Sequence, residues 1–88
     1  MRFHIPDDVL TAHLDSETVL LNMATKRYFH LNGTGQRVWQ LLESGSDVDA
    51  IAASLCVDFD VDRDTANVEV QLLLQAFRDL GIVQEGML

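Results

Sequence analysis

Three short segments of strand-forming residues occupy the first third of the chain. They run over residues 9–14, 18–23 and 27–31, and three-residue, mostly polar connections separate them. Connections this short join strands that lie side by side, so the pattern predicts an antiparallel meander. The middle segment is apolar at successive positions, so it is apolar on both faces, which suits a central strand. In the third segment, alternation places Tyr28 and His30 on one face, and Arg27, Phe29 and Leu31 on the other.

From residue 32 onward apolar residues recur three and four apart, which predicts helices. The first helix starts at Asn32 or Thr34, either of which can cap it, and ends before the Ser44–Ser46 stretch. The second helix follows the capping residue Asp47.

An acidic connector over residues 58–62 leads into the third and longest helix. This helix starts at Asp62 or Asp64 and runs to Leu80, where Gly81 is a typical stop. Residues 82–83 are expected to form a short closing strand, and the tail after Gln84 is expected to fray.

The long helix carries more apolar surface than one small core requires. At about 100° per residue, five apolar side chains fall in one sector and form the expected core stripe: Ala66, Val70, Leu73, Phe77 and Leu80. Val68, Leu72 and Ala76 fall in a neighbouring sector, flanked by Thr65 and Asp79. The second stripe is either part of a wide buried face or the wall of a groove that is open to a ligand.

Composition bounds the class of protein. The 88 residues suffice for one domain, and a hydrophobic content of 48% excludes disorder. No apolar run approaches the ~20 residues that cross a bilayer, and the acidic N-terminal residues do not resemble a signal peptide. The single cysteine excludes an internal disulfide and any multi-cysteine metal site. We therefore expect one α+β domain over residues 1–88, located in the cytoplasm.

The charge excludes another class. The chain has 14 acidic and 6 basic residues, a net charge of −8. Such a surface repels a phosphate backbone, so we expect no nucleic-acid binding.

Three sequence patterns resemble functional sites, namely a calcium loop, a dinucleotide fingerprint and a reactive cysteine, but each lacks a residue that the site requires. The acidic residues from Asp58 to Glu69 imitate a calcium loop, but Arg63 occupies the position that needs glycine, so they are interpreted as helix caps. Gly33-Thr34-Gly35 lacks the third glycine of a dinucleotide fingerprint. Cys56 has no associated histidine and is expected to be a buried apolar residue. We therefore expect no enzyme activity, no metal and no cofactor.

Taken in order, these segments resemble the PqqD-like family of recognition elements for ribosomally made, post-translationally modified peptides. The residues that carry the resemblance are Val19–Asn22, Tyr28–Asn32, Val38–Gly45, Ile51–Leu55, Val70–Leu74 and Phe77–Val83. The resemblance implies a winged-helix-like domain in which a three-stranded antiparallel sheet is followed by three helices.

The resemblance also implies a function. Members of the family bind the leader segment of a precursor peptide as a strand added to the third strand, beside the third helix. The residues that it assigns to peptide binding are Lys26, Arg27, Tyr28, Phe29, His30, Leu31, Val68, Leu72, Ala76 and Asp79. It implies a free-standing member of lasso-peptide biosynthesis, whose partners are a leader peptidase and an ATP-dependent macrolactam-forming cyclase, with no membrane partner.

Three alternatives stay open at this point. The chain could serve another modified-peptide pathway or a quinone-cofactor pathway. It could be an acidic winged-helix regulator, although the long helix lacks the basic character of a DNA-reading helix. It could also be a structural subunit whose second apolar stripe forms a dimer interface.

Overall fold

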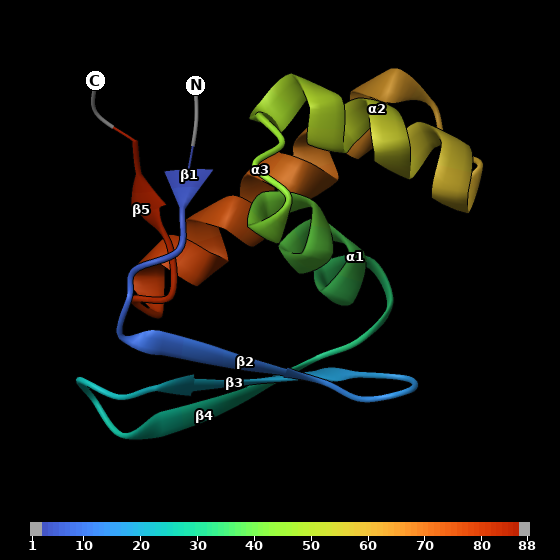
Figure 1. Cartoon of the computed structure of the whole chain (residues 1–88). Helices are drawn as coiled ribbons and strands as arrows, with labels where there is room; N and C mark the ends of the chain where they lie inside the picture. Colours follow the sequence, from blue (N-terminus) through green and yellow to red (C-terminus); the bar gives the residue numbers. More distant parts are fainter. Residues whose placement is uncertain (1–2, 87–88) are drawn as a thin grey trace.

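In the computed structural model, which describes residues 3–86, a layer of helices covers one face of a sheet (Figure 1). The strands are β1 (Phe3–His4), β2 (Val9–His13), β3 (Thr18–Asn22), β4 (Arg27–Leu31) and β5 (Gln84–Glu85). The helices are α1 (Gly33–Glu43), α2 (Val48–Phe59) and α3 (Arg63–Asp79). The predicted α+β fold, a three-stranded antiparallel sheet followed by three helices, is confirmed.

The main sheet has the order β2-β3-β4, and all its pairs are antiparallel. Its register forms rows across the three strands, such as Leu10, Leu21 and Tyr28. The central position of β3, which its apolar residues predicted, is confirmed. Thr18 and Leu20 face the helices and are buried, whereas Val19 and Leu21, on the other face, are half-buried.

The chain ends meet in a second, two-stranded sheet that the sequence did not predict. β1 pairs with β5, with Phe3 opposite Glu85 and His4 opposite Gln84 (Figure 1). The expected closing strand at residues 82–83 is therefore wrong by two residues. Ile82 and Val83 are instead core residues, and they precede the strand. Residues 84–85 are paired and not frayed, and residues 87–88 lie outside the described range.

Capping residues set the helix starts. Asp47 Oδ1 accepts a hydrogen bond from the Ala50 N–H at 2.8 Å, and Asp62 Oδ1 accepts one from the Thr65 N–H at 2.7 Å. Hydrogen bonds from Thr65, first from its side chain and then from its backbone, lower the pKa of Asp62. α2 extends through Phe59, so the acidic connector is shorter than expected, and Asp60 ends the helix in a left-handed conformation with φ of 53°.

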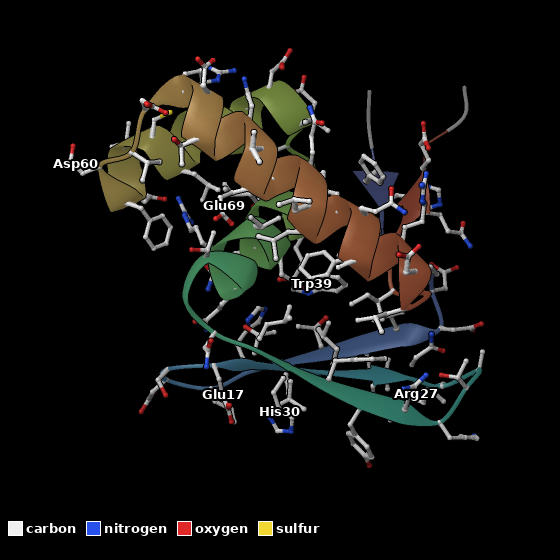
Figure 2. The ribbon with its side chains drawn as sticks, turned by 180° about the vertical axis from the view of Figure 1, so that it is seen from behind. Glu17, Arg27, His30, Trp39, Asp60 and Glu69 are labelled. Atoms are coloured by element: carbon white, nitrogen blue, oxygen red, sulfur yellow. The ribbon has the colours of Figure 1, made fainter. Side chains whose placement is uncertain are left out.

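Trp39 lies at the centre of the core, between the helices and the sheet (Figure 2). Its ring meets Phe77 edge-on with centroids 5.7 Å apart, and its indole N–H donates to Thr11 Oγ1 at 3.2 Å. Burying this large side chain with its polar group satisfied gives one core shared by both layers.

The buried face of α3 differs from the predicted stripe. Its buried residues are Ala66, Val70, Leu74 and Phe77. Leu73 is only half-buried, and Leu80, which follows the helix, is 38% exposed. The buried sector is rotated toward Leu74 because α2 packs against that side of α3, and the sequence pattern does not show which neighbour covers which sector.

Candidate peptide-binding surface

β4 is an edge strand of the main sheet. Within residues 3–86, β3 is its only strand neighbour, so its outer side presents backbone N–H and C=O groups that no strand pairs. An edge of this kind is a template for an additional strand. Backbone pairing fixes direction and register, and side chains beside the edge then determine sequence preference.

The side chains of β4 divide between two faces as the sequence predicted. Phe29 and Leu31 are half-buried and pack against the core, so they face the helices. The Arg27 guanidinium lies above the Phe29 ring, 5.8 Å from its centroid. Tyr28 is 68% exposed on the opposite face, where His30 Nδ1 lies 3.5 Å from Glu17 Oε2 (Figure 2).

The second apolar stripe of α3 is exposed, so it does not belong to a wide buried face. Val68 is 59% and Leu72 is 65% exposed, and Ala76 is exposed as well. Asp79, the last residue of the helix, is also exposed and accepts a hydrogen bond from Gln75 Nε2 at 3.1 Å. The four α3 residues assigned to peptide binding thus lie on the surface.

These residues are not equally close to β4. The side of α3 that carries Gln75 and Arg78 faces β1, β5 and the start of α2. At about 100° per residue, the opposite side carries Glu69, Ala76 and Leu80, with Leu73 between them and the core. Figure 2 shows Glu69 on the side of α3 that is turned toward the sheet.

The helix geometry therefore changes the make-up of the α3 wall. Ala76 is on the side of α3 turned toward β4. Leu72, about 40° from it, lies at the rim, and Val68, about 80° from Ala76, lies on the outer surface. At the same spacing, Leu73 and Leu80, which the sequence assigned to the core, fall on the side of α3 that carries Glu69 and Ala76. We use the term β4–α3 surface for the side chains of Arg27, Phe29, Leu31, Glu69, Leu72, Leu73, Ala76 and Leu80.

Unpaired positive charge lies at one end of this surface. Among residues 3–86, Arg37, Arg63 and Arg78 each have a carboxylate partner: Asp58, Asp49 and Glu85. Arg27 and Lys26 have none in this range, and Lys26 is an exposed turn residue with φ of 64°. Among the described residues of this chain, whose net charge is −8, these two cations are therefore available to an acidic group of a ligand.

The other candidate motifs have structural roles. Asp62 and Asp60 serve as the cap before α3 and the terminator of α2, and no group of three or more potential metal ligands gathers within residues 3–86. Gly33 has φ of 55° at the turn from β4 into α1, and Cys56 is half-buried against the core. None of the helices described is long and apolar enough to span a membrane.

The sequence match decides the family. Residues 17–83, from the loop before β3 to the buried Val83, match the family described as coenzyme PQQ synthesis protein D (PqqD). The chain belongs to the PqqD family. The matched range contains β3, β4 and all three helices, so it includes every element of the β4–α3 surface.

Two solved structures match the fold of this PqqD-family chain over nearly its whole length. TbiB1, solved in complex with the TbiA(β) leader peptide, is 34% identical, with a TM-score of 0.91 over 96% of this chain and 98% of TbiB1. A lasso peptide synthetase B1, complexed with the leader peptide, has the same fold at 24% identity, with a TM-score of 0.87 over 97% of this chain and 100% of that protein. No curated protein matches the chain. The resemblance to peptide-recognition elements is thus confirmed.

Proposed function

We propose that this protein binds the leader segment of a lasso-type precursor peptide as a fourth strand on β4. The observation that carries the proposal is the open edge of β4 beside α3. The chain shares its fold, over 96% of its length, with a protein whose structure was solved with a bound leader peptide. The leader backbone pairs with β4, and its alternate side chains contact the β4–α3 surface.

Each part of the β4–α3 surface has a distinct role in this binding. Main-chain hydrogen bonds each contribute roughly 0.5–1.5 kcal/mol net of water and hold direction and register. Apolar leader side chains pack against Phe29, Ala76 and Leu80, which supplies selectivity. Arg27 meets an acidic leader residue, and this exposed contact is worth less than about 1 kcal/mol.

The consequence of binding is delivery and not catalysis. The protein holds the leader in the cytoplasm, while a leader peptidase and an ATP-dependent macrolactam-forming cyclase act on the precursor. It contributes no catalytic group, no cofactor and no metal. The unmodified part of the precursor stays free, because only the leader joins the sheet.

A second pathway is favoured by the family's description, which refers to coenzyme PQQ synthesis. In that case the same edge would hold the precursor of a quinone cofactor. Titration of the protein with a lasso-type leader and with a quinone-cofactor precursor peptide distinguishes the two, because alternate side-chain contacts differ even though the backbone bonds are the same.

Calorimetric titration with the N-terminal half of a lasso-type precursor peptide tests the proposal. We expect metal-independent binding with a negative heat-capacity change, because apolar surface is buried. A leader with proline at a position whose N–H joins the ladder should lose binding, since proline removes that donor. Normal binding of the proline variant, together with loss of binding on charge reversal in the leader, would show an electrostatic contact instead of an added strand.

A further inference from the structure

A pocket of about 490 Å³ lies on the side of α3 that is turned away from β4, outside the β4–α3 surface. Volumes in the range of about 300–1,000 Å³ are typical of ligand sites. Its walls come from the start of α2, the second half of α3 and the β1–β5 pair. The lining residues are Phe3, Asp47, Val48, Asp49, Gln71, Leu74, Gln75, Arg78 and Glu85.

The floor of the pocket is apolar and continuous with the core. Leu74 is 2% exposed, and Phe3 and Val48 are half-buried against the same cluster. Phe3 and Glu85 reach this position because β1 pairs with β5, which joins the two ends of the chain beside α3 (Figure 2). An apolar stem of a ligand would therefore contact a preformed surface.

The rim of the pocket is acidic. Three carboxylates, those of Asp47, Asp49 and Glu85, stand against one guanidinium, so the lining has a formal charge of −2 (one minus three). That guanidinium is already occupied, because Arg78 donates to Glu85 at 3.0 Å and to Gln75 at 2.8 Å. The Asp49 side chain is 92% exposed; its Oδ1 forms a long ion pair with Arg63, at 4.0 Å, and its Oδ2 has no cation partner within residues 3–86. Negative charge on the rim is thus available to a cation.

An amide completes the rim. Gln71 is exposed on α3, and its side-chain amide has no hydrogen-bond partner within residues 3–86, so this amide can bond the backbone of a bound chain. A ligand that complements the apolar floor, the acidic rim and the Gln71 amide has an apolar stem, a cationic end and an adjacent peptide group. Arginine and lysine side chains have this combination.

We propose that this pocket binds an arginine or lysine side chain presented by a partner protein. The stem lies on Leu74, Phe3 and Val48, and the cation meets Asp49 and Asp47 at the start of α2. The net charge of −8 attracts a basic partner at long range and increases the rate of encounter. Because the pocket and the β4–α3 surface are on opposite sides of α3, a basic partner and a leader can be bound at once.

A titration of ¹⁵N-labelled protein with N-acetyl-arginine N-methylamide tests the pocket without the leader. We expect saturable shifts of the backbone amides of Val48, Gln71, Gln75 and Glu85, with a dissociation constant in the millimolar range. N-acetyl-norleucine N-methylamide, which keeps the stem and lacks the cation, should bind at least threefold more weakly. Equal binding of the two probes would overturn the charge assignment.

Matched variants separate the pocket from the general acidic surface. Asp49→Asn should weaken arginine binding two- to fivefold, whereas Asp64→Asn, which removes one exposed carboxylate outside the pocket, should leave it unchanged. Gln71→Trp should fill the pocket and remove saturable binding, with a thermal melt to confirm that the variant folds. Equal weakening by Asp49→Asn and Asp64→Asn would show diffuse attraction to the surface and contradict the proposal, whatever the outcome of leader binding.

Discussion

Leu72 and Leu74 are two residues apart and have opposite environments on α3. They point about 160° apart around the helix axis, and the exposed fraction is 65% for Leu72 and 2% for Leu74. Leu72→Asp should keep the stability within about 0.5 kcal/mol but reduce leader affinity about tenfold, because it puts a charge at the rim of the β4–α3 surface. Leu74→Asp should unfold the domain, since an unpaired charge in the core costs several kcal/mol. Thermal melts and calorimetry measure the two effects.

Leu74 is the appropriate core control in that comparison, and Leu73 is not. The sequence placed Leu73 in the core, but it is half-buried and helical spacing puts it on the Glu69 side of α3, so Leu73→Asp would alter stability and binding together. Similar destabilisation by Leu72→Asp and Leu74→Asp would mean that Leu72 supports the fold and does not contact the leader.

Arg27 differs from the other described arginines in having no carboxylate partner, so we expect it to bind an acidic residue of the leader. Arg27→Gln should weaken binding of a leader with an acidic residue near that end two- to fivefold at low salt, and the difference should shrink as salt screens the contact. Arg63→Gln, at the far end of α3, is the control and should have no effect. An Arg27→Gln effect that persists at high salt would indicate that the residue acts through its packing on Phe29.

At the scale of elements, Asp62 makes the start of α3 sensitive to acid. Its pKa is lowered in the folded state, so its stabilising contribution is present above the ordinary value of 3.8 and is lost as the pH falls through the folded value. Asp62→Asn keeps a capping side chain that does not titrate. Melting temperatures measured from pH 6 to pH 3 should fall less steeply for Asp62→Asn than for the parent protein. Parallel curves would show that other carboxylates dominate the acid transition.

Elements whose signals are local were predictable from the sequence. Asp47 and Asp62 mark helix starts through their own hydrogen bonds, and Gly81, with φ of 78°, marks the stop after α3. β1 and β5 were missed because each has two residues, and the only evidence for either is its partner at the other end of the chain. A pattern of alternating side chains cannot appear over two residues.

The site was predictable only in part for a similar reason. The exposed stripe at Leu72 follows from helical spacing, but the run Leu72-Leu73-Leu74 points in three directions, and its apolar character does not say which direction meets α2 or the sheet. The pocket on the other side of α3 could not be predicted from the sequence, because its walls come from three segments that are distant along the chain.

At the scale of the whole molecule, the row of Leu10, Leu21 and Tyr28 gives the protein a face that water wets poorly. Leu10 and Tyr28 are 51% and 68% exposed, and this side of the sheet has no covering layer within residues 3–86. At neutral pH the net charge of −8 keeps two copies apart, so colloidal stability depends on charge and not on a polar surface.

That dependence defines the conditions in which the protein should leave solution. Light scattering should rise as the pH approaches 4.4, where the net charge vanishes, since repulsion between the apolar faces then disappears. Leu10→Lys should lower this scattering more than Val57→Lys, which adds the same charge at an 82% exposed position on α2. Equal protection by the two variants would assign the effect to charge alone. Stronger protection by Leu10→Lys would mean that storage, labelling and crystallisation of this protein are governed by the uncovered face of its sheet.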